Sequence, residues 1–205
     1  MFIFFSIFAV IHEPPSVRYS SAIQIKNVYS KNRLTVTTET GGIQYQQPTI
    51  YSTRPPFDDG WTWIINPEED NITLARTPIK CGSNITMMNP LNKLYVSTTS
   101  NSEKVEVVPS AHLQGKQSVW TVICESGDVW IRDKQIQLLN AKYNCYLSTS
   151  LALRTKELVN RYNVTCSSLS ADAIWKASEG IYFLDRETQN KKNDDSNEDN
   201  HKEDL

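Results

Sequence analysis

The sequence predicts an all-β fold, and three observations lead to this prediction. A segment of 13 residues recurs three times without a gap, and a tryptophan follows each copy, at Trp63, Trp120 and Trp175. Helical periodicity is nearly absent, and only residues 151–160 fit one short helix. Units of about 50 residues that cannot each bury an apolar face must pack around one shared core. The closed arrangement of three such units is a β-trefoil, which is a barrel capped by hairpins.

Each copy of the repeated segment predicts a hairpin. Two apolar residues at alternate positions turn one face of a strand into the core. An asparagine (Asn27, Asn89 or Asn140) then begins a turn, because its side chain bonds the backbone ahead. The second strand returns with an aliphatic residue, and the tryptophan closes the unit. The predicted core consists of Ile23, Ile25, Leu34, Trp63, Ile85, Met87, Val96, Trp120, Ile136, Leu138, Leu147 and Trp175.

We expect the chain to divide into a leader, a domain and a tail. Residues 2–11 form an apolar run that is too short to span a bilayer but suits a secretory signal peptide. Ser20, Ser21 and Ala22 offer a cleavage site, so residues 1–21 are assigned to the signal peptide; the alternative is a buried N-terminal strand. The domain then covers residues 22–184, with repeats at about 22–66, 77–124 and 128–178.

The tail, residues 185–205, is acidic and is expected to be disordered. It holds eight acidic and four basic residues, a charge of −4, and the whole chain carries −2. This balance leaves a body of only +2, which argues against nucleic-acid binding. The last residues are Lys202, Glu203, Asp204 and Leu205, the endoplasmic-reticulum retrieval signal with its two acids exchanged. The other explanation is a chance match in a charged tail.

Three sequons and four cysteines indicate an oxidising, lumenal compartment. The sequons predict N-glycosylation at Asn71, Asn84 and Asn163. An even number of cysteines fits the same compartment. No other segment approaches the length of a membrane span, so we expect no membrane insertion. The expected location is the lumen of the endoplasmic reticulum, or the exterior if the terminal signal is not read.

The repeats resemble MIR motifs, and later segments resemble the stromal cell-derived factor 2 family. These segments are residues 77–82 (TPIKCG), 120–124 (WTVIC), 129–133 (VWIRD), 164–166 (VTC), 171–177 (ADAIWKA) and 179–182 (EGIY). The likeness runs from about residue 22 to residue 184. The first repeat departs from it, because Ser21 and Ala22 stand where the family has Cys-Gly.

The resemblance implies a MIR-type β-trefoil that resides in the endoplasmic reticulum and has no enzymatic activity and no cofactor. It also implies association with a lumenal J-domain co-chaperone and, through it, with the heat-shock-70-type chaperone BiP. The remaining implied partners are misfolded polypeptide clients, which the complex keeps soluble.

In a trefoil the four cysteines favour two pairs. Cys81 and Cys124 flank the second repeat symmetrically, on strands that both enter the barrel. Cys145 and Cys166 lie on the two middle strands of the third repeat. We therefore predict the disulfides Cys81–Cys124 and Cys145–Cys166; the alternative for Cys145 is a free buried thiol.

The sequence lacks the patterns that catalysis needs. No Cys-x-x-Cys spacing occurs, which disfavours redox chemistry and zinc binding. His112 is the one candidate base in the domain, and its loop-like surroundings predict a surface position. The acids at residues 58–59 and 68–70 lie in turn-like segments and not across a cleft, as glycosidases require. We therefore predict that this protein is not an enzyme.

Protein binding is the leading interpretation. Tyr51, Phe57 and Trp61 are candidate exposed anchors, and the alternative is that they are core or rim residues. Two other functions stay open: a carbohydrate-binding trefoil, and an accessory factor of protein O-mannosylation, since MIR repeats occur in protein O-mannosyltransferases. Trefoil lectins carry Gln-x-Trp once per repeat, and residues 117–120 (QSVW) are one residue too long.

Overall fold

The computed structural model describes residues 14–37, 48–54, 60–68, 72–101, 104–154 and 161–183. Twelve strands and three short 3-10 helices form within these ranges, so the predicted all-β fold is confirmed. The strands are β1 (Ala22–Asn27), β2 (Arg33–Thr37), β3 (Thr49–Thr53), β4 (Thr62–Pro67), β5 (Asn84–Met88), β6 (Tyr95–Ser100), β7 (Val105–Ser110), β8 (Trp120–Cys124), β9 (Ile136–Asn140), β10 (Tyr146–Arg154), β11 (Arg161–Ser167) and β12 (Trp175–Ile181). The 3-10 helices are η1 (Ile72–Leu74), η2 (Gly115–Gln117) and η3 (Ala171–Ala173).

One detail of the prediction is wrong. Residues 151–154, which the sequence placed at the start of a short helix, continue strand β10 up to Arg154. The antiparallel pairing of Arg154 with Tyr162 of β11 holds this end of β10 in the sheet.

Six strands close into a barrel. β1 pairs with β12, β12 with β9, β9 with β8, β8 with β5, β5 with β4, and β4 with β1 again. All of these pairings are antiparallel. A sheet that closes on itself leaves no unpaired edge within this ring.

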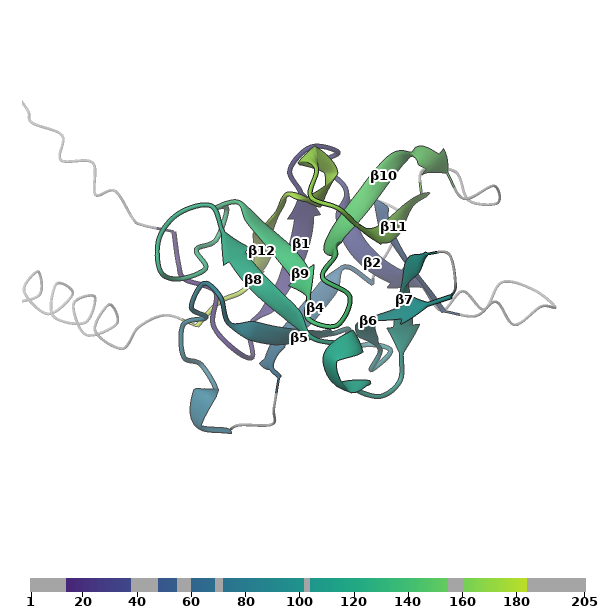
Figure 1. Cartoon of the computed structure of the whole chain (residues 1–205). Helices are drawn as coiled ribbons and strands as arrows, with labels where there is room; N and C mark the ends of the chain where they lie inside the picture. Colours follow the sequence, from purple (N-terminus) through teal and green to yellow (C-terminus); the bar gives the residue numbers. More distant parts are fainter. Residues whose placement is uncertain are drawn as a thin grey trace, which may run out of the picture.

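Three hairpins stand at one end of the barrel. They are β2–β3, β6–β7 and β10–β11, and β11 also pairs with β3 and β7. Figure 1 shows the barrel strands on the left and the hairpins on the right. A ring of strands capped by three hairpins is consistent with the β-trefoil that the sequence predicts.

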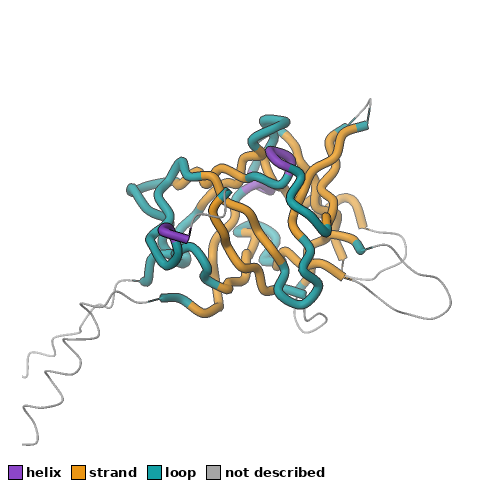
Figure 2. Tube along the Cα trace, turned by 90° about the horizontal axis from the view of Figure 1, so that it is seen from below, coloured by secondary structure: helices purple, strands orange, loops and turns teal. Residues whose placement is uncertain are grey.

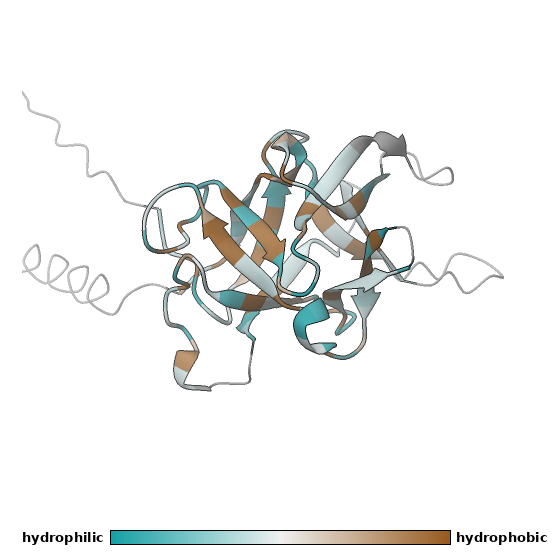
Figure 3. Ribbon diagram, viewed as in Figure 1, coloured by the Kyte–Doolittle hydropathy of each residue, from teal (hydrophilic) through white to brown (hydrophobic). Residues whose placement is uncertain are grey.

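The barrel is filled by the side chains that the alternating pattern selects. All twelve predicted core residues are at most 1% exposed. Along β1 and β9, buried residues alternate with half-buried ones, as one inward face requires. Figure 3 shows the resulting bands of apolar residues on β8 and β9. Burial of one face of each barrel strand is the main source of stability for this architecture.

The same tryptophan contact recurs in three places. The indole Nε1 of Trp63, Trp120 and Trp175 donates to the carbonyl oxygen of Leu34, Val96 and Leu147, at 2.9, 3.0 and 2.7 Å. Each acceptor is the aliphatic second residue of the first strand of a hairpin, which is β2, β6 or β10. Each tryptophan thus fills the barrel and satisfies its only polar atom at the same time.

The turn asparagines also act alike. Asn27, Asn89 and Asn140 are fully buried, and the side-chain oxygen of each accepts bonds from the second and third backbone N–H groups ahead. The side-chain nitrogen of each donates to two carbonyls of the segment that leads into a barrel strand. An asparagine is required here because only an amide supplies both an acceptor and two donors on one short side chain.

Candidate functional site at the base of the barrel

The end of the barrel opposite the hairpins is closed by a ring of backbone hydrogen bonds. The N–H of Val17 donates to the carbonyl of Trp130 at 2.7 Å, that of Trp130 to Ile79 at 2.8 Å, and that of Ile79 to Val17 at 3.0 Å. All three side chains are fully buried. We call these three residues the base ring. The segment that precedes each hairpin unit contributes one member to it.

The base ring shows that the domain starts earlier in the chain than the sequence predicts. The sequence assigned residues 1–21 to a signal peptide, but Val17 and Tyr19 belong to the hydrophobic core, and Ser21 is fully buried. We call residues 15–21 the N-terminal strap. The folded domain therefore begins near residue 15 and not at residue 22. Residues 1–13, which contain the apolar run, lie outside the described residues.

Arg132 brings the two ends of the domain together. Its backbone N–H donates to the carbonyl of Pro15 at 3.0 Å, and its guanidinium stacks on the ring of Tyr182 at 5.4 Å. The guanidinium also lies 3.4 Å from the carboxylate of Asp133, which pairs with Lys176 at 2.8 Å. Figure 2 shows both described ends on the same side of the molecule. Because these charges are partly exposed, each ion pair contributes little stability by itself.

Aromatic residues anchor the C-terminal end of the domain. The phenol of Tyr182 donates to the carbonyl of Ser178, and burial raises the pKa of Tyr182 above its ordinary value, although the nearby charge of Arg132 opposes this effect. The guanidinium carbon of Arg76 lies over the ring of Phe183, 4.9 Å from the ring centroid. Two cation–π contacts therefore fix the end of the described chain against the base of the barrel.

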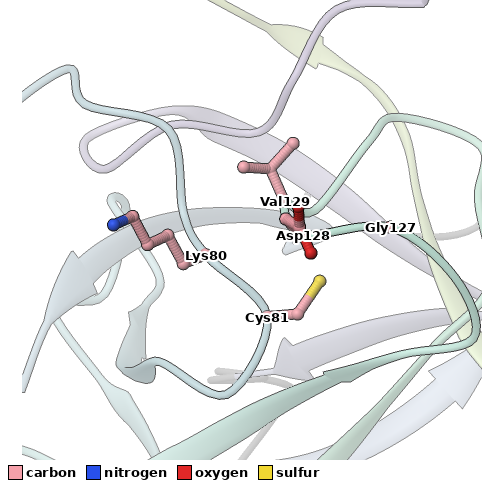
Figure 4. Close-up of a pocket in the computed structure, with 5 residues that line it drawn as sticks. All are labelled: Lys80, Cys81, Gly127, Asp128 and Val129. Atoms are coloured by element: carbon pink, nitrogen blue, oxygen red, sulfur yellow. The ribbon is translucent and has the colours of Figure 1, made fainter.

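A shallow pocket of about 460 Å³ lies beside the base ring and is lined by Lys80, Cys81, Gly127, Asp128 and Val129. In Figure 4 the sulfur of Cys81 points toward Asp128 and Val129, whereas the side chain of Lys80 points away. Cys81 is bonded to Cys124, so it offers no thiolate nucleophile.

Within the part of the chain that the structure describes, no three His, Cys, Asp or Glu side chains gather as a metal site. The described residues also contain no helix long and apolar enough to span a membrane.

Both disulfides join the predicted partners. Cys81 pairs with Cys124, with a Cα–Cα distance of 5.6 Å, and Cys145 pairs with Cys166, with a Cα–Cα distance of 5.3 Å. The free-thiol alternative for Cys145 is thereby wrong, and no cysteine is free. The first bridge fastens the wall of the pocket to β8, and the second ties the residue that precedes β10 to β11.

The three predicted glycosylation sites have different surroundings. Asn84 lies half-buried in β5, where its amide nitrogen donates to Glu68 at 2.8 Å and its oxygen accepts from Thr121 at 2.7 Å. Asn163 lies half-buried in β11, opposite Tyr51 of β3. Asn71 lies outside the described residues, as do Lys202, Glu203, Asp204 and Leu205 of the predicted retrieval signal.

The three candidate anchors of the predicted binding surface differ in solvent exposure. Tyr51 is 1% exposed, and the guanidinium of Arg161 stacks over its ring at 4.6 Å. The prediction of an exposed anchor is therefore wrong for Tyr51, and the alternative of a core residue is confirmed. Trp61 is half-buried, and Phe57 lies outside the described residues. His112 is exposed, as predicted. Glu68 is half-buried, and the acids at residues 58–59 and 69–70 are not described.

One cluster was not foreseen from the sequence. Arg33 is only 8% exposed, and its Nη2 lies 2.9 Å from both carboxylate oxygens of Glu179. The same guanidinium stacks over the ring of Trp61 at 4.9 Å. These contacts fasten β2 and the entry to β4 onto β12. Arg33 and Glu179 are 146 residues apart, so no local pattern indicates their pairing.

No protein-family model and no curated protein matches the sequence. Solved structures do match it. The SDF2-like protein from Arabidopsis thaliana superimposes with a TM-score of 0.71 at 21% identity, over 83% of this chain and 99% of that chain. A Caenorhabditis elegans protein of unknown function superimposes with a TM-score of 0.69 at 22% identity, over 84% of this chain and 100% of that chain. The fold is SDF2-like.

A part of a larger enzyme complex shares the SDF2-like fold. The Saccharomyces cerevisiae protein O-mannosyltransferase Pmt1-Pmt2 complex superimposes with a TM-score of 0.68 at 14% identity. The match covers 88% of this chain but only 28% of that chain. At identities this low, the comparisons establish the SDF2-like fold and not the activity.

Proposed function

We propose that this chain is a lumenal, non-enzymatic member of the stromal cell-derived factor 2-like family, built as a β-trefoil of three MIR repeats. It binds a J-domain co-chaperone and, through it, a BiP-type chaperone, and so assists the folding and quality control of misfolded clients. The observation that carries this proposal is the superposition over 99% of the SDF2-like protein from Arabidopsis thaliana. That match spans a whole chain and not one part of an enzyme.

The recurring contacts support three equivalent repeats. The tryptophan bond, the buried asparagine and the base ring each occur three times at matching places in the chain. The positive φ angles recur likewise at Ser20, Gly82 and Asp133, and at Lys31, Lys93 and Asn144. Two disulfides support an oxidising compartment.

The test is recovery of partners from cells. The chain carries an internal tag that leaves Leu205 free, cells are treated with a mild cross-linker, and partners are identified by mass spectrometry. The proposal predicts a lumenal J-domain protein together with BiP. A matched chain that lacks Leu205 controls for location, because it is expected in the medium, without these partners. Recovery of other proteins, with no J-domain protein, would contradict the proposal.

A second candidate rests on the likeness to the Pmt1-Pmt2 complex. In this alternative the chain assists protein O-mannosylation or binds glycans directly. The same experiment separates the two functions, because an accessory factor recovers a mannosyltransferase and a lectin recovers glycoproteins. A glycan array without binders would remove the direct carbohydrate-binding alternative.

A further inference from the structure

The pocket beside the base ring has a disulfide sulfur in its wall. Cys81 lines the pocket, and Figure 4 shows its sulfur pointing toward Asp128 and Val129. Cys81 is half-buried and lies in the turn between the Lys80–Val129 bridge and β5. Its partner Cys124, at the end of β8, packs against the hydrophobic core. A reagent that enters the pocket therefore meets the Cys81 side of this disulfide.

The other disulfide is more closely covered. Cys145 is 9% exposed, and Cys166 packs against the hydrophobic core. Cys166 lies in β11, opposite Leu147 of β10, and β11 also pairs with β3 and β7, so strands lie on both sides of it. Thiol–disulfide exchange requires the attacking sulfur to reach a sulfur of the bridge directly. The two disulfides therefore differ in their access to an external thiol.

We propose that Cys81–Cys124 is a thiol–disulfide exchange site and that its reactants are external dithiols. A thiolate in the pocket attacks Cys81 Sγ and forms a new S–S bond, while the Cys81–Cys124 bond breaks and Cys124 leaves as a thiolate. The second thiol of the reagent, as a thiolate, then displaces Cys81. The reagent is thereby oxidised to a disulfide, and the two cysteines receive its two electrons and its two protons. This site goes beyond the proposed function, since it needs the domain and a dithiol but no chaperone partner.

Backbone hydrogen bonds hold the turn around Cys81 when the disulfide is open. The N–H of Cys81 donates to the carbonyl of Asp128 at 2.9 Å, and the N–H of Gly82 donates to the carbonyl of Val122 at 2.7 Å. Neither bond depends on a sulfur atom, so we expect the reduced domain to stay folded and its two thiols to stay close enough to reclose. Reduction removes the covalent link between the pocket wall and β8, which is expected to lower the melting temperature by roughly 10 °C.

Asp128 gives the pocket a charge that acts on the reagent. The sulfur of Cys81 points toward Asp128, so the carboxylate repels an incoming thiolate. Asp128 is exposed, and salt therefore screens this repulsion. Asp128→Asn is expected to speed the reduction of Cys81–Cys124 about twofold at low ionic strength and to have no effect in about 1 M salt. Glu106→Gln is the matched control, because it removes the same charge from β7 at the hairpin end and is expected to leave this rate unchanged.

The test follows the reduction of each disulfide in the oxidised full chain. Dithiothreitol is added at about pH 8, samples are quenched over time with N-ethylmaleimide, and mass spectrometry of the peptides reports which cysteines are labelled. The expected result is that Cys81 and Cys124 are labelled at least about tenfold faster than the other two cysteines, while the circular dichroism of the strands is retained. Equal rates, or earlier opening of Cys145–Cys166, would overturn the inference. An Asp128→Asn chain that is reduced at the unaltered rate at low salt would also overturn it.

A second measurement identifies the sulfur that is attacked. The oxidised chain is exposed briefly to glutathione, a monothiol, and acid stops the reaction before the mixed disulfides are mapped by mass spectrometry. The expected product carries glutathione on Cys81 and a free thiol on Cys124. Glutathione found mainly on Cys124 would contradict attack through the pocket. Both measurements use the purified chain, so their failure would leave the proposed chaperone partners standing, and failure to recover a J-domain protein would leave this site standing.

Discussion

Single buried polar side chains organise the turns of this protein. Asn89 illustrates the principle: its amide donates to the carbonyls of Gly60 and Thr62, and its oxygen accepts from the N–H groups of Leu91 and Asn92, all at 3.1 Å. Asn89→Ala removes these four hydrogen bonds at a side chain that is fully buried, so we expect a loss of about 2–4 kcal/mol in the free energy of unfolding. Urea denaturation measures this loss.

Leu91 supplies the control for Asn89, because it lies in the same turn and is 66% exposed. Leu91→Ala is expected to change the free energy of unfolding by less than about 0.5 kcal/mol. Equal effects of the two substitutions would contradict the role given to the buried amide.

Asn84 is expected to carry no glycan in the folded protein. A glycan is attached through the amide nitrogen, which here donates to Glu68 at 2.8 Å, while the oxygen accepts from Thr121. The sequon's Thr86 is also buried, at 1% exposure. A chain modified at Asn84 would have to break this network to form β5. Mass spectrometry after enzymatic deglycosylation in water enriched in oxygen-18 measures occupancy, and a high occupancy at Asn84 in the secreted or lumenal pool would show that the network is not required.

Tyr182 makes stability depend on pH in the alkaline range. Burial raises the pKa of its phenol in the folded chain, whereas the unfolded chain keeps a value of about 10. Above pH 10 the unfolded chain therefore releases this proton more readily, and the contribution of the neutral phenol to stability is lost as the pH rises. Tyr182→Phe removes this dependence. We expect the stability difference between the two proteins to shrink from pH 8 to pH 10.5 in urea titrations, and a constant difference would refute the assignment.

At the scale of elements, the two disulfides close loops of 43 and 21 residues. Restriction of the unfolded chain predicts a contribution of about 4 kcal/mol from Cys81–Cys124 and about 3 kcal/mol from Cys145–Cys166. Replacing each pair with serines and measuring urea denaturation tests this order. A larger loss for the 145–166 pair would show that loop length does not set the order of the two contributions.

The strands inside the repeats were predictable and the N-terminal strap was not, for a physical reason. Hairpin strands bury one face, so Ile85 and Met87 show the alternation that reports burial. The N-terminal strap is held mostly by backbone N–H and C=O groups, which every residue type except proline can supply, so Val17 stands in no recognisable pattern. The cysteine pairs were predictable because repeat positions fix them, whereas the pair of Arg33 with Glu179 depends on packing between distant strands.

At the scale of the whole molecule, the closed barrel and the base ring predict that the domain unfolds as one unit. β1 and β12 come from opposite ends of the chain and are paired, and the core is shared by all twelve strands of the described residues. No repeat contains a closed sheet of its own, so none buries its apolar face alone.

Thermal unfolding followed by tryptophan fluorescence and by circular dichroism is therefore expected to give one coincident transition. Fluorescence reports the buried indoles of Trp63, Trp120, Trp130 and Trp175, which are distributed over the three units, and circular dichroism reports the strands. A peptide of residues 77–124 with its disulfide intact is the matched fragment, and it is expected to remain unfolded. The reason is that β5 pairs with β8 inside the fragment but also with β4 outside it. A folded fragment, or two separate transitions in the whole domain, would mean that the units are independent. The closed barrel and the base ring would then not be the source of cooperativity.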